Sequence, residues 1–521
     1  MIELSLARIA EIVGGRLTDI SADQAAATHV TGTVEFDSRA VTSGGLFLAL
    51  PGARSDGHDF AAAAVAAGAV AVLAARPVGV PARVVEPAPA PAPDPDTDTD
   101  TDSRSGRTAG VLEHDADGSG GAVLAALAKL AAAVAAELVK DGMTIVGITG
   151  SSGKTSTKDL IAAVLAPLGE VIAPPGSFNN ELGHPWTVLR ATRSTDYLVL
   201  EMSARHPGNI AALAEIAPPS IATVLNVGTA HLGEFGTREA IAATKSELPQ
   251  AVPASGVVIL NADDPVVAQM AAKTAARVVR VGRCSDTAEA GVRVDIWAEN
   301  VILDPLARAC FTLHAGGAQV DVSLAVHGDH QVSNALCAAA VALECGADLD
   351  QVATALGGAS PASRQRMQVS ARADGVTLIN DAYNANPDSM RAGLKALAWM
   401  GRGGPPGSRT WAVLGEMAEL GEDAISEHDS IGRLAVRLDV SRLIVVGTGR
   451  PMSAMLHGAV MEGSWGSEAT AVADADTALE LLRAELRGGD VVLVKASNSA
   501  GLGALADALA ADVPGIGEVP R

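Results

Sequence analysis

A phosphate-binding loop is the clearest chemical signal in the chain. Residues 143–155 read Met-Thr-Ile-Val-Gly-Ile-Thr-Gly-Ser-Ser-Gly-Lys-Thr, which predicts a buried strand, a glycine-rich turn and the start of a helix. Gly150 and Gly153 allow consecutive backbone N–H groups to point at one anion, and the helix N-terminus adds a partial positive charge. We expect Lys154 to meet the β- and γ-phosphates of a nucleotide and the Thr155 hydroxyl to face Mg²⁺.

The spacing of this loop departs from the strict G-x-x-x-x-G-K-[ST] pattern, because Ile148 stands five residues before Gly153. Glycines after a strand are usually plain turn residues, but here the Gly-Lys-Thr core is followed directly by a predicted helix. The sequence therefore predicts a nucleotide site. The residues of the loop that we expect to contact the nucleotide are Thr149, Gly150, Ser151, Ser152, Gly153, Lys154, Thr155 and Ser156.

Two polar residues follow later strands at positions where a metal ligand could lie. Glu201 ends the apolar run 197–200. Ligands of parallel sheets gather outside the carboxyl ends of the strands, so Glu201 could reach an Mg²⁺ held by Thr155, although a capping or solvated glutamate explains the position equally well. His231 lies just beyond the strand predicted at 221–227. A lone loop histidine is more often a surface residue.

Three more polar residues occupy helices or strand ends of the same region. Lys245 falls inside a helix predicted at 238–248, where a lysine normally marks the solvent-exposed face. Asn261 begins a polar cluster directly after the strand predicted at 257–260, and Asn334 lies in the first part of an alanine-rich helix. The alternation of strands and helices predicts a parallel sheet with crossover helices.

The elements on either side of this region predict one domain before it and one after it. Residues 1–85 predict a small α/β domain, in which the polar loops 36–39 and 50–59 are explained as surface turns by the residues alone. Its predicted elements are helices 4–13 and 60–68 and strands 32–36, 46–50 and 70–73. A third alternating region begins at Ser363 and predicts a doubly wound domain without a second phosphate loop.

A compositionally biased insertion separates the first domain from the second. Residues 86–110 consist of Pro-Ala repeats, an Asp-Thr tract and a Ser-Arg segment, which predict an extended, disordered spacer. A strand at 110–113 and a helix at 122–138 follow. That helix is apolar, but it is short and contains Lys129 and Glu137, so a packed interdomain helix is favoured over a membrane span. The predicted domains are 1–114, 115–360 and 361–521.

The overall composition limits the classes of function. The net charge of −22 argues against general binding to nucleic acid or to anionic membranes. The four cysteines have no zinc-site spacing, so reduced thiols are expected, without disulfides. The first residues lack the basic flank and apolar run of a signal peptide, which favours a cytoplasmic protein without membrane insertion.

Taken together, these motifs resemble those of the Mur ligases, the ATP-dependent amide-forming enzymes that build the peptide of peptidoglycan. The resemblance covers nearly the whole chain except the spacer. Residues 149–155 resemble the ATP loop of the family, Glu201 its magnesium carboxylate and His231 the histidine of its second metal site. Lys245, in Ala-Thr-Lys-Ser-Glu, resembles the lysine that family members carry as a carbamate.

The resemblance also implies the remaining nucleotide contacts. Asn261, in Asn-Ala-Asp-Asp, and Asn334 resemble the residues that contact adenine and ribose. Arg366 and Asp381 match residues of the third domain that close over the nucleotide. The family has a small α/β domain for the UDP end, a central ATP domain and a Rossmann-like third domain, so this α/β fold in three domains is expected here, with ATP and Mg²⁺ as cofactors.

Within the family, the residues are most similar to those of the ligase that adds D-alanyl-D-alanine to UDP-N-acetylmuramoyl-tripeptide. The segment 381–390, with Asn384 and Asn386, is similar to the signature of that member, and so is the loop 414–421 with His428 downstream. Asn179 and Asn180, in the segment 176–183, resemble its peptide-binding loop. Ser38 and Arg39, together with the segment 56–58, resemble its uridine side.

The resemblance has one departure and leaves alternatives open. Residues 495–498 read Lys-Ala-Ser-Asn, where many members have Lys-Gly-Ser-Arg. The expected function is ATP-dependent ligation through an acyl phosphate by a monomer, with UDP-N-acetylmuramoyl-tripeptide and D-alanyl-D-alanine as partners and no nucleic acid. The alternatives are another Mur-type ligase, a folylpolyglutamate synthase-like enzyme, and a phosphate-loop ATPase acting as a motor or switch.

Overall fold

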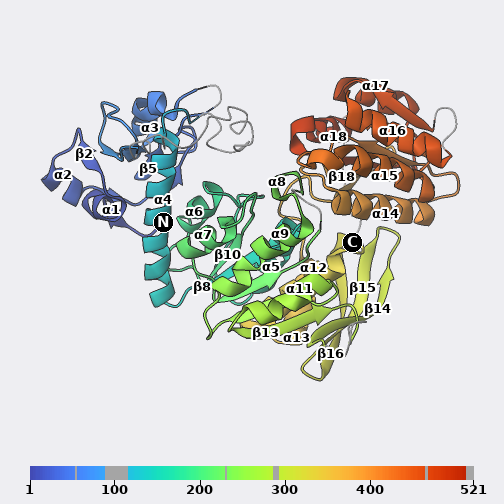
Figure 1. Ribbon diagram of the computed structural model, residues 1–521, viewed down its shortest axis with the longest axis horizontal. Helices are drawn as coiled ribbons and strands as arrows, with labels where there is room; N and C mark the ends of the chain where they lie inside the picture. Colours follow the sequence, from blue (N-terminus) through green and yellow to red (C-terminus); the bar gives the residue numbers. More distant parts are fainter. Residues whose placement is uncertain (53–54, 88–114, 229–231, 286–292, 464–467, 512–521) are drawn as a thin grey trace, which may run out of the picture.

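The chain folds into three α/β units, each with its own sheet (Figure 1). The computed structural model describes residues 1–52, 55–87, 115–228, 232–285, 293–463 and 468–511. The strand predicted at 110–113, nearly all of the predicted spacer and His231 lie outside the described residues. Figure 1 shows the N-terminal unit in blue and the C-terminal unit in orange and red on opposite sides of the central unit. The three-domain α/β organisation predicted from the sequence is confirmed.

The N-terminal unit is built on a five-stranded sheet of order β2-β7-β6-β5-β4. The helix predicted at 4–13 begins only at Leu6, because Leu4 and Ser5 pair with a second short strand and the Ser5 hydroxyl accepts a hydrogen bond from Arg8 N (3.2 Å). The elements are β1 (Leu4–Ser5), α1 (Leu6–Val13), β2 (Arg16–Thr18), α2 (Ala22–Ala27), β3 (His29–Val30), β4 (Val34–Glu35), β5 (Gly45–Leu48), α3 (Ala61–Ala67), β6 (Ala69–Ala74) and β7 (Ala82–Val84).

The central unit contains a nine-stranded sheet of order β16-β15-β14-β13-β12-β11-β8-β10-β9. Its elements are α4 (Ser119–Lys140), β8 (Thr144–Thr149), α5 (Lys154–Leu165), β9 (Val171–Ile172), α6 (Gly183–Val188), β10 (Tyr197–Glu201), α7 (Asn209–Ile216), β11 (Ile221–Val224), α8 (Leu232–Phe235), α9 (Arg238–Lys245), α10 (Glu247–Ala251), β12 (Val257–Asn261), α11 (Pro265–Ala268), β13 (Arg277–Gly282), β14 (Ile296–Leu303), β15 (Arg308–Ala315), β16 (Ala318–His327), α12 (Gln331–Glu344) and α13 (Leu349–Gly358).

The central sheet is parallel from β9 to β14, but β14, β15 and β16 pair antiparallel. The parallel prediction was therefore incomplete, because no crossover helix separates these last three strands. The helix predicted at 238–248 is also divided, into α9 and α10, at Ser246. Pro249 has no N–H to donate to the carbonyl of Lys245, so a continuous helix would lose a hydrogen bond there.

The C-terminal unit has a six-stranded sheet of order β17-β18-β22-β19-β20-β21, parallel except for β17. Its two faces are covered by α14, α15 and α16 on one side and by α17 and α18 on the other, which confirms the doubly wound prediction. The elements are β17 (Gln368–Ala371), β18 (Thr377–Asn380), α14 (Pro387–Gly403), β19 (Thr410–Leu414), α15 (Ala424–Arg437), β20 (Arg442–Val446), α16 (Arg450–Glu462), β21 (Ala469–Val472), α17 (Ala475–Glu485), β22 (Val491–Lys495) and α18 (Leu502–Ala511).

The long helix α4 joins the first unit to the second. It packs against α1 on one side and against α6 and α7 on the other, and it runs between these units in Figure 1. Its length and apolar composition would suffice to cross a membrane, but half of its most apolar window is buried inside the molecule. The sequence-based interpretation of this segment as a packed interdomain helix is thus confirmed.

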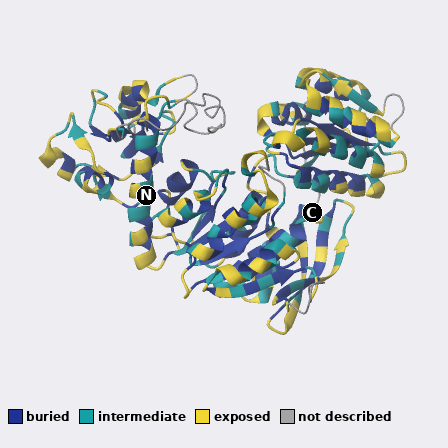
Figure 2. Cartoon of the chain, in the orientation of Figure 1, coloured by how far each residue is buried: buried dark blue, intermediate teal, exposed yellow. Residues whose placement is uncertain are grey.

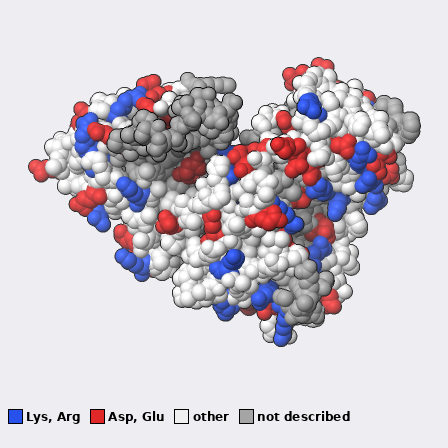
Figure 3. All heavy atoms as spheres, in the orientation of Figure 1, with Lys and Arg blue, Asp and Glu red and all other residues white. Residues whose placement is uncertain are grey.

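Each of the three units has a buried sheet and an exposed, charged outer surface. The strands of all three sheets are mostly buried, while exposed residues lie on the outer faces of the helices (Figure 2). On the face shown in Figure 3, basic side chains of the described residues are scattered among acidic ones and form no continuous basic surface. All four cysteines are free.

An aromatic cluster fixes the N-terminal unit against the central one. The ring of Phe36 lies 6.4 Å from that of Phe178 and 5.7 Å from that of Trp186, and Trp186 Nε1 donates to Val34 O (2.8 Å). His184, two residues before Trp186 in α6, is fully buried. Burial lowers the pKa of His184 to about 4, and the nearby carbonyls of Leu213 and Glu201 offset this only in part.

The burial of His184 predicts acid lability. Below pH 6.5 the unfolded chain binds a proton at this residue, whereas the folded chain does so only near pH 4, so acidification across this window favours unfolding by about 3 kcal/mol. We expect the melting temperature of His184→Leu to fall less than that of the wild type between pH 6.5 and pH 4. The exposed His457→Gln is the control and should retain the wild-type profile.

Candidate active site

The phosphate loop connects the end of β8, in the middle of the central sheet, to the N-terminus of α5. Gly153 has a φ of 83° and a Cβ there would lie 2.7 Å from Asn334 Oδ1, so both the backbone conformation and the space require glycine. Lys154 Nζ donates to Gly150 O (2.8 Å). Burial lowers the pKa of Lys154, and the Glu201 carboxylate partly offsets the effect. The predicted strand, turn and helix are confirmed here.

Asn226 supports this loop and was missed by the sequence analysis. Its Oδ1 accepts hydrogen bonds from Ser151 N (3.0 Å) and Ser152 N (2.9 Å). These two N–H groups therefore face an amide oxygen instead of an open anion site, contrary to expectation. The first N–H groups of α5, which have no acceptor within the helix, are the ones aimed at an anion. The position of Asn226 after β11, next to the end of β8, is the signal that could have identified it.

The predicted magnesium ligands Thr155 and Glu201 lie together. Thr155 Oγ1 donates to Glu201 Oε2 (3.0 Å), because β10 and β8 are neighbouring parallel strands that place their carboxyl ends side by side. Asn179 Nδ2 donates to the other oxygen of Glu201 (2.6 Å). A hydroxyl and a carboxylate are hard oxygen donors that suit Mg²⁺. No cluster of three or more His, Cys, Asp or Glu side chains arranged for a metal occurs in the described part of the chain.

Lys245 is buried, so its interpretation as a residue of the solvent-exposed helix face was wrong. Burial, together with the nearby charge of Lys154, lowers the pKa of Lys245 well below its ordinary value. No hydrogen-bond acceptor for its Nζ occurs among the described residues.

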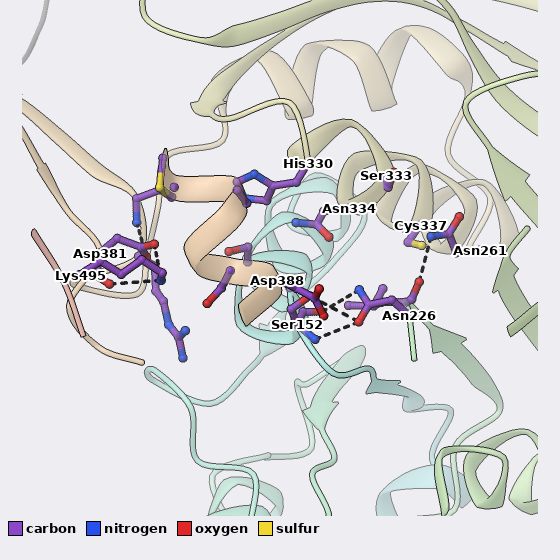
Figure 4. Close-up of a pocket in the computed structure, with 18 residues that line it drawn as sticks. Ser152, Asn226, Asn261, His330, Ser333, Asn334, Cys337, Asp381, Asp388 and Lys495 are labelled. Carbon is purple, nitrogen blue, oxygen red and sulfur yellow. Dashed lines mark hydrogen bonds and ion pairs between the residues drawn. The ribbon is translucent and has the colours of Figure 1, made fainter. Parts of the chain in front are cut away.

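A cavity of about 270 Å³ opens beside the phosphate loop, between the central and C-terminal units (Figure 4). Four residues that the family resemblance assigned to the nucleotide line it, namely Asn261, Asn334, Arg366 and Asp381. Asn261 Nδ2 donates to Leu225 O (2.9 Å), and Asn334 Nδ2 donates to Gln331 Oε1 (2.8 Å). The structure thus brings these four side chains and the loop to one cavity.

Lys495 is a second residue that the predicted site lacked. Its Nζ contacts Asp381 Oδ2 (2.6 Å) and Asn384 O (3.0 Å), and its side chain is 1% exposed. Burial lowers the pKa of Lys495, and Asp381 partly offsets the effect. In Figure 4, this ion pair lies across the cavity from Asn226 and Asn261. Asp381 is therefore held by a lysine of its own unit.

Arg366 lies between two cavities. It also lines a larger cavity of about 810 Å³, which includes Lys154, Thr155 and Glu201. Its Nη2 donates to Ser177 Oγ (2.9 Å), and its guanidinium lies 4.4 Å from the centroid of the Tyr383 ring.

The four predicted peptide-binding asparagines, Asn179, Asn180, Asn384 and Asn386, all line the larger cavity. All four already have structural partners: Asn179 Nδ2 donates to Glu201 Oε1 (2.6 Å), and Asn384 Oδ1 accepts from Ala385 N (2.9 Å). Asn386 Oδ1 caps α14 by accepting from Ser389 N (2.9 Å), and Asn180 Oδ1 accepts from Gly183 N (2.9 Å) at the start of α6. Asn386 Nδ2 also donates to Ser151 O (3.5 Å), so the Nδ2 groups of Asn180 and Asn384 are the amide donors without a partner among the described residues.

Ser38 and Arg39 are not among the residues that line either cavity. The Arg39 guanidinium beside Asp37 lowers the pKa of that carboxyl to about 2. Phe36, in the same loop, contacts Phe178 of the segment 176–183, so the loop lies next to the central unit.

Two histidines of the segments singled out in the sequence serve the fold. His58 Nε2 accepts from Ala75 N (3.0 Å), and its Nδ1 contacts Asp56 Oδ1 (2.6 Å). His428 Nε2 accepts from Met417 N (2.9 Å). His428 thereby orders the loop 414–421 that leads toward the larger cavity.

Comparison with known proteins agrees with this arrangement. Residues 148–342 match the Mur ligase middle domain, residues 365–498 the glutamate ligase domain of Mur ligases, and residues 31–101 the Mur ligase family catalytic domain. A relative from Mycobacterium tuberculosis, named UDP-N-acetylmuramoyl-tripeptide--D-alanyl-D-alanine ligase, is 72% identical over 98% of both chains. The chain belongs to the Mur ligase family. A relative of the same name from Escherichia coli is 33% identical over 96% of this chain and 97% of its own.

Solved structures of Mur ligases share the fold over nearly the full length. A crystal structure of MurF from Acinetobacter baumannii has a TM-score of 0.77 at 28% identity, with 97% of this chain and 98% of that chain covered. The MurF ligase from Thermotoga maritima in complex with ADP has a TM-score of 0.71 at 27% identity, with 92% and 97% covered.

The geometry of the loop predicts that Lys154→Ala folds but has lost its activity. Among the described residues, the only hydrogen bond of Lys154 Nζ is to a backbone carbonyl of its own loop, so removal of this group leaves the hydrophobic cores unchanged. We expect the rate of ADP formation to fall at least about a hundredfold, because the variant loses the ammonium group beside the phosphate that is transferred. The melting temperature should stay close to that of the wild type. Near-normal turnover in a folded variant would contradict the assignment.

Proposed function

We propose that this Mur ligase joins D-alanyl-D-alanine to UDP-N-acetylmuramoyl-tripeptide at the expense of ATP. The observation that carries the proposal is the near-full-length similarity, 72% over 98% of both chains, to relatives with that activity in their names. The MurF ligase from Thermotoga maritima, whose crystal structure contains ADP, supports the use of ATP by this fold. The two cavities described above are the places where we propose that the nucleotide and the peptide substrates bind.

The two cavities meet at the phosphate loop, and this arrangement suits phosphoryl transfer between two bound reactants. Ser152, Gly153 and Ser156 line both cavities. A nucleotide whose base and ribose lie in the smaller cavity, beside Asn261 and Asn334, would direct its terminal phosphate along the loop toward the larger one. The carboxylate of the tripeptide would approach that phosphate from the larger cavity.

The reaction needs a carboxylate to attack a negatively charged phosphate. Lys154, Arg366 and the first N–H groups of α5 offset the repulsion and stabilise the charge that develops on the bridging oxygen. The products of this step are ADP and an acyl phosphate. The amine of D-alanyl-D-alanine then attacks the acyl carbon, phosphate leaves and an amide remains. Glu201 and Thr155, with their hard oxygen atoms, are the groups we propose for Mg²⁺, which supplies further charge neutralisation when bound.

We also propose that Lys245 carries a carbamate. Carbon dioxide adds to a neutral amine, forming an N–C bond and releasing one proton to solvent, and burial beside Lys154 favours the neutral form of Lys245. The product would turn a buried cation into a hard oxygen ligand directed at the same region. With His231, which lies outside the described residues, the carbamate would supply the second half of the metal site that the family resemblance implies.

The dipeptide is proposed to bind at the C-terminal wall of the larger cavity. Asn384, Asn386, Glu419 and Asn498 line that wall. The loop 414–421 is held across the cavity, since Glu419 pairs with Arg205 (3.0 Å) and Glu419 O accepts from Gly233 N (3.3 Å). Closure of this loop would shield the acyl phosphate from water.

The remaining parts of the proposal concern the oligomeric state, the cellular location and the contacts to UDP. We propose that the enzyme acts as a monomer. We propose a cytoplasmic location, because ATP and UDP-linked precursors are cytoplasmic metabolites. Ser38 and Arg39 are proposed to contact the UDP end. The relatives described above favour this ligase over another Mur-type ligase, a folylpolyglutamate synthase-like enzyme or a motor ATPase, and the substrate test below separates it from these three.

We expect ADP and phosphate to appear at an appreciable rate only when UDP-N-acetylmuramoyl-tripeptide and D-alanyl-D-alanine are both present. One pentapeptide should form per ATP. Because the peptide carboxylate attacks phosphorus, oxygen-18 placed in that carboxylate should emerge partly in the released phosphate. Coupled ADP detection and mass spectrometry measure both outcomes.

The outcomes of this assay separate the alternatives. ATP hydrolysis without a peptide acceptor would indicate a motor or switch. Equal efficiency with a single amino acid in place of the dipeptide would indicate another Mur-type or glutamate-adding ligase. Retention of all the label in the peptide would exclude an acyl phosphate.

The carbamate hypothesis predicts chemical rescue of Lys245→Ala. Loss of the carbamate should reduce turnover at least about a hundredfold, and added acetate or formate should restore part of it by supplying an oxygen ligand in the space left by the side chain. Lys245→Arg, which keeps the charge but cannot form a stable carbamate, is the matched control and should be inactive without rescue. Full activity of Lys245→Ala would exclude the hypothesis.

A further inference from the structure

A buried cluster of three polar side chains lies behind the phosphate loop and outside the site assigned so far. Lys158 and Asp159 belong to α5, and Ser363 belongs to the linker between α13 and β17. Their relative exposures are 2%, 9% and 4%. A charge buried this deeply is tolerated only when it is well paired, so the cluster must have a specific arrangement.

The carboxylate of the cluster fixes the linker at one residue. Asp159 Oδ2 accepts from Ser363 N (3.0 Å), and Asp159 Oδ1 accepts from Ser363 Oγ (3.2 Å). Ser363 is therefore held through both its backbone and its side chain. Two of the next four residues, Gln365 and Met367, have φ angles of 58° and 48°, which non-glycine residues seldom adopt. The anchor thus precedes a strained turn, and Arg366 stands inside that turn.

The lysine of the cluster fixes a second segment. Lys158 Nζ donates to Ser363 Oγ (3.1 Å) and to Pro174 O (2.8 Å). The residues three positions after these two anchors are Arg366 and Ser177, and they contact each other through Nη2 and Oγ (2.9 Å). Ser177 Oγ in turn lies 2.7 Å from Thr155 Oγ1. One lysine therefore holds both chain segments that converge beside the phosphate loop.

The positions of these residues on α5 explain how the contact is transmitted. Thr155 precedes Lys158 by three residues and Asp159 by four, so all three lie on one face of the helix. On that face, Lys158 contacts Pro174 and Asp159 contacts Ser363. One turn closer to the N-terminus, Thr155 contacts Ser177 and Arg366. The cluster, the two segments and the start of α5 form a closed ring of contacts.

We propose that Lys158, Asp159 and Ser363 are positioning residues that place the Arg366 guanidinium against the phosphate groups of the nucleotide. They touch no substrate themselves, since none of them lines either cavity. Their effect on the ligase reaction passes through Arg366 and rests on the function proposed above. Without the anchor, the turn at 364–367 relaxes and the guanidinium leaves the phosphates. A small displacement of such a group costs up to about a hundredfold in rate.

A double-mutant cycle tests this proposal. Lys158 Nζ and Asp159 Oδ1 form an ion pair (2.5 Å). Ser363→Ala is the first variant, because it removes a neutral hydroxyl and leaves these two charges paired. We expect the kcat of Ser363→Ala to fall about tenfold with a smaller change in the KM for the tripeptide, since a displaced guanidinium acts mainly on the transition state. In the Arg366→Ala background, the same substitution should change kcat less than about twofold, because the group that it positions is already absent.

Controls separate positioning from general stability. Ser363→Thr keeps the hydroxyl and should retain most of the wild-type activity. Ser441→Ala removes the hydroxyl that accepts from Thr410 N (3.1 Å), away from both cavities, and should leave kcat unchanged. Equal losses from Ser363→Ala in the wild-type and Arg366→Ala backgrounds would overturn the proposal, and so would an unchanged kcat in the single variant.

A binding measurement keeps this test separate from the function test. The affinity for a fluorescent ATP analogue, measured without peptide substrates, should fall at least about threefold in Ser363→Ala and show the same lack of additivity with Arg366→Ala. If the wild type fails to use D-alanyl-D-alanine but this binding pattern holds, the proposed substrate is wrong and the positioning role stands. Additive losses of affinity would refute the positioning role whatever the substrate.

Discussion

The start of α5 is the constraint on which the rest of the structure depends. Its free N–H groups are useful to an anion only where water is largely displaced and where the reactants can approach from two sides. The central sheet places this helix start at the carboxyl end of β8, with β10 and β11 on either side. The polar ends of these neighbours supply Glu201 and Asn226, so the sheet order determines which side chains meet the phosphates.

Binding of anionic reactants at this helix start also requires positively charged side chains nearby. The chain carries a net charge of −22, yet Lys154, Arg366 and Lys495 line the two cavities, and Lys245 lies close enough to Lys154 to feel its charge. Burial lowers the pKa values of the three lysines, which means that the folded protein holds these groups at some cost in stability. Anionic substrates would remove part of that cost, because each added phosphate or carboxylate favours the charged form. Local cations within an acidic protein also explain how anionic substrates can bind although the net charge is negative.

The sequence predicted the local parts of this site well and the long-range parts poorly. The strand, turn and helix at 143–155 follow from glycine, lysine and threonine at fixed spacing, so a single sequence is enough. The meeting of Thr155 and Glu201 followed from the rule that strand ends share one sheet edge. The antiparallel strands β14, β15 and β16 and the interruption at Ser246 depend on strand pairing and on one proline, and they were missed.

The least predictable residues are those whose environment comes from distant segments. Lys245 has the sequence context of an exposed helix face, and only packing against the central core makes it a buried amine. Lys158 and Asp159 resemble an ordinary charged pair on α5 until Ser363, more than 200 residues later, supplies the third partner. Arg366 was found through family resemblance, but its place beside Ser177 depends on this remote contact. A catalytic group can therefore be recognised from a motif, whereas the groups that hold it in position become visible only when the three units are assembled.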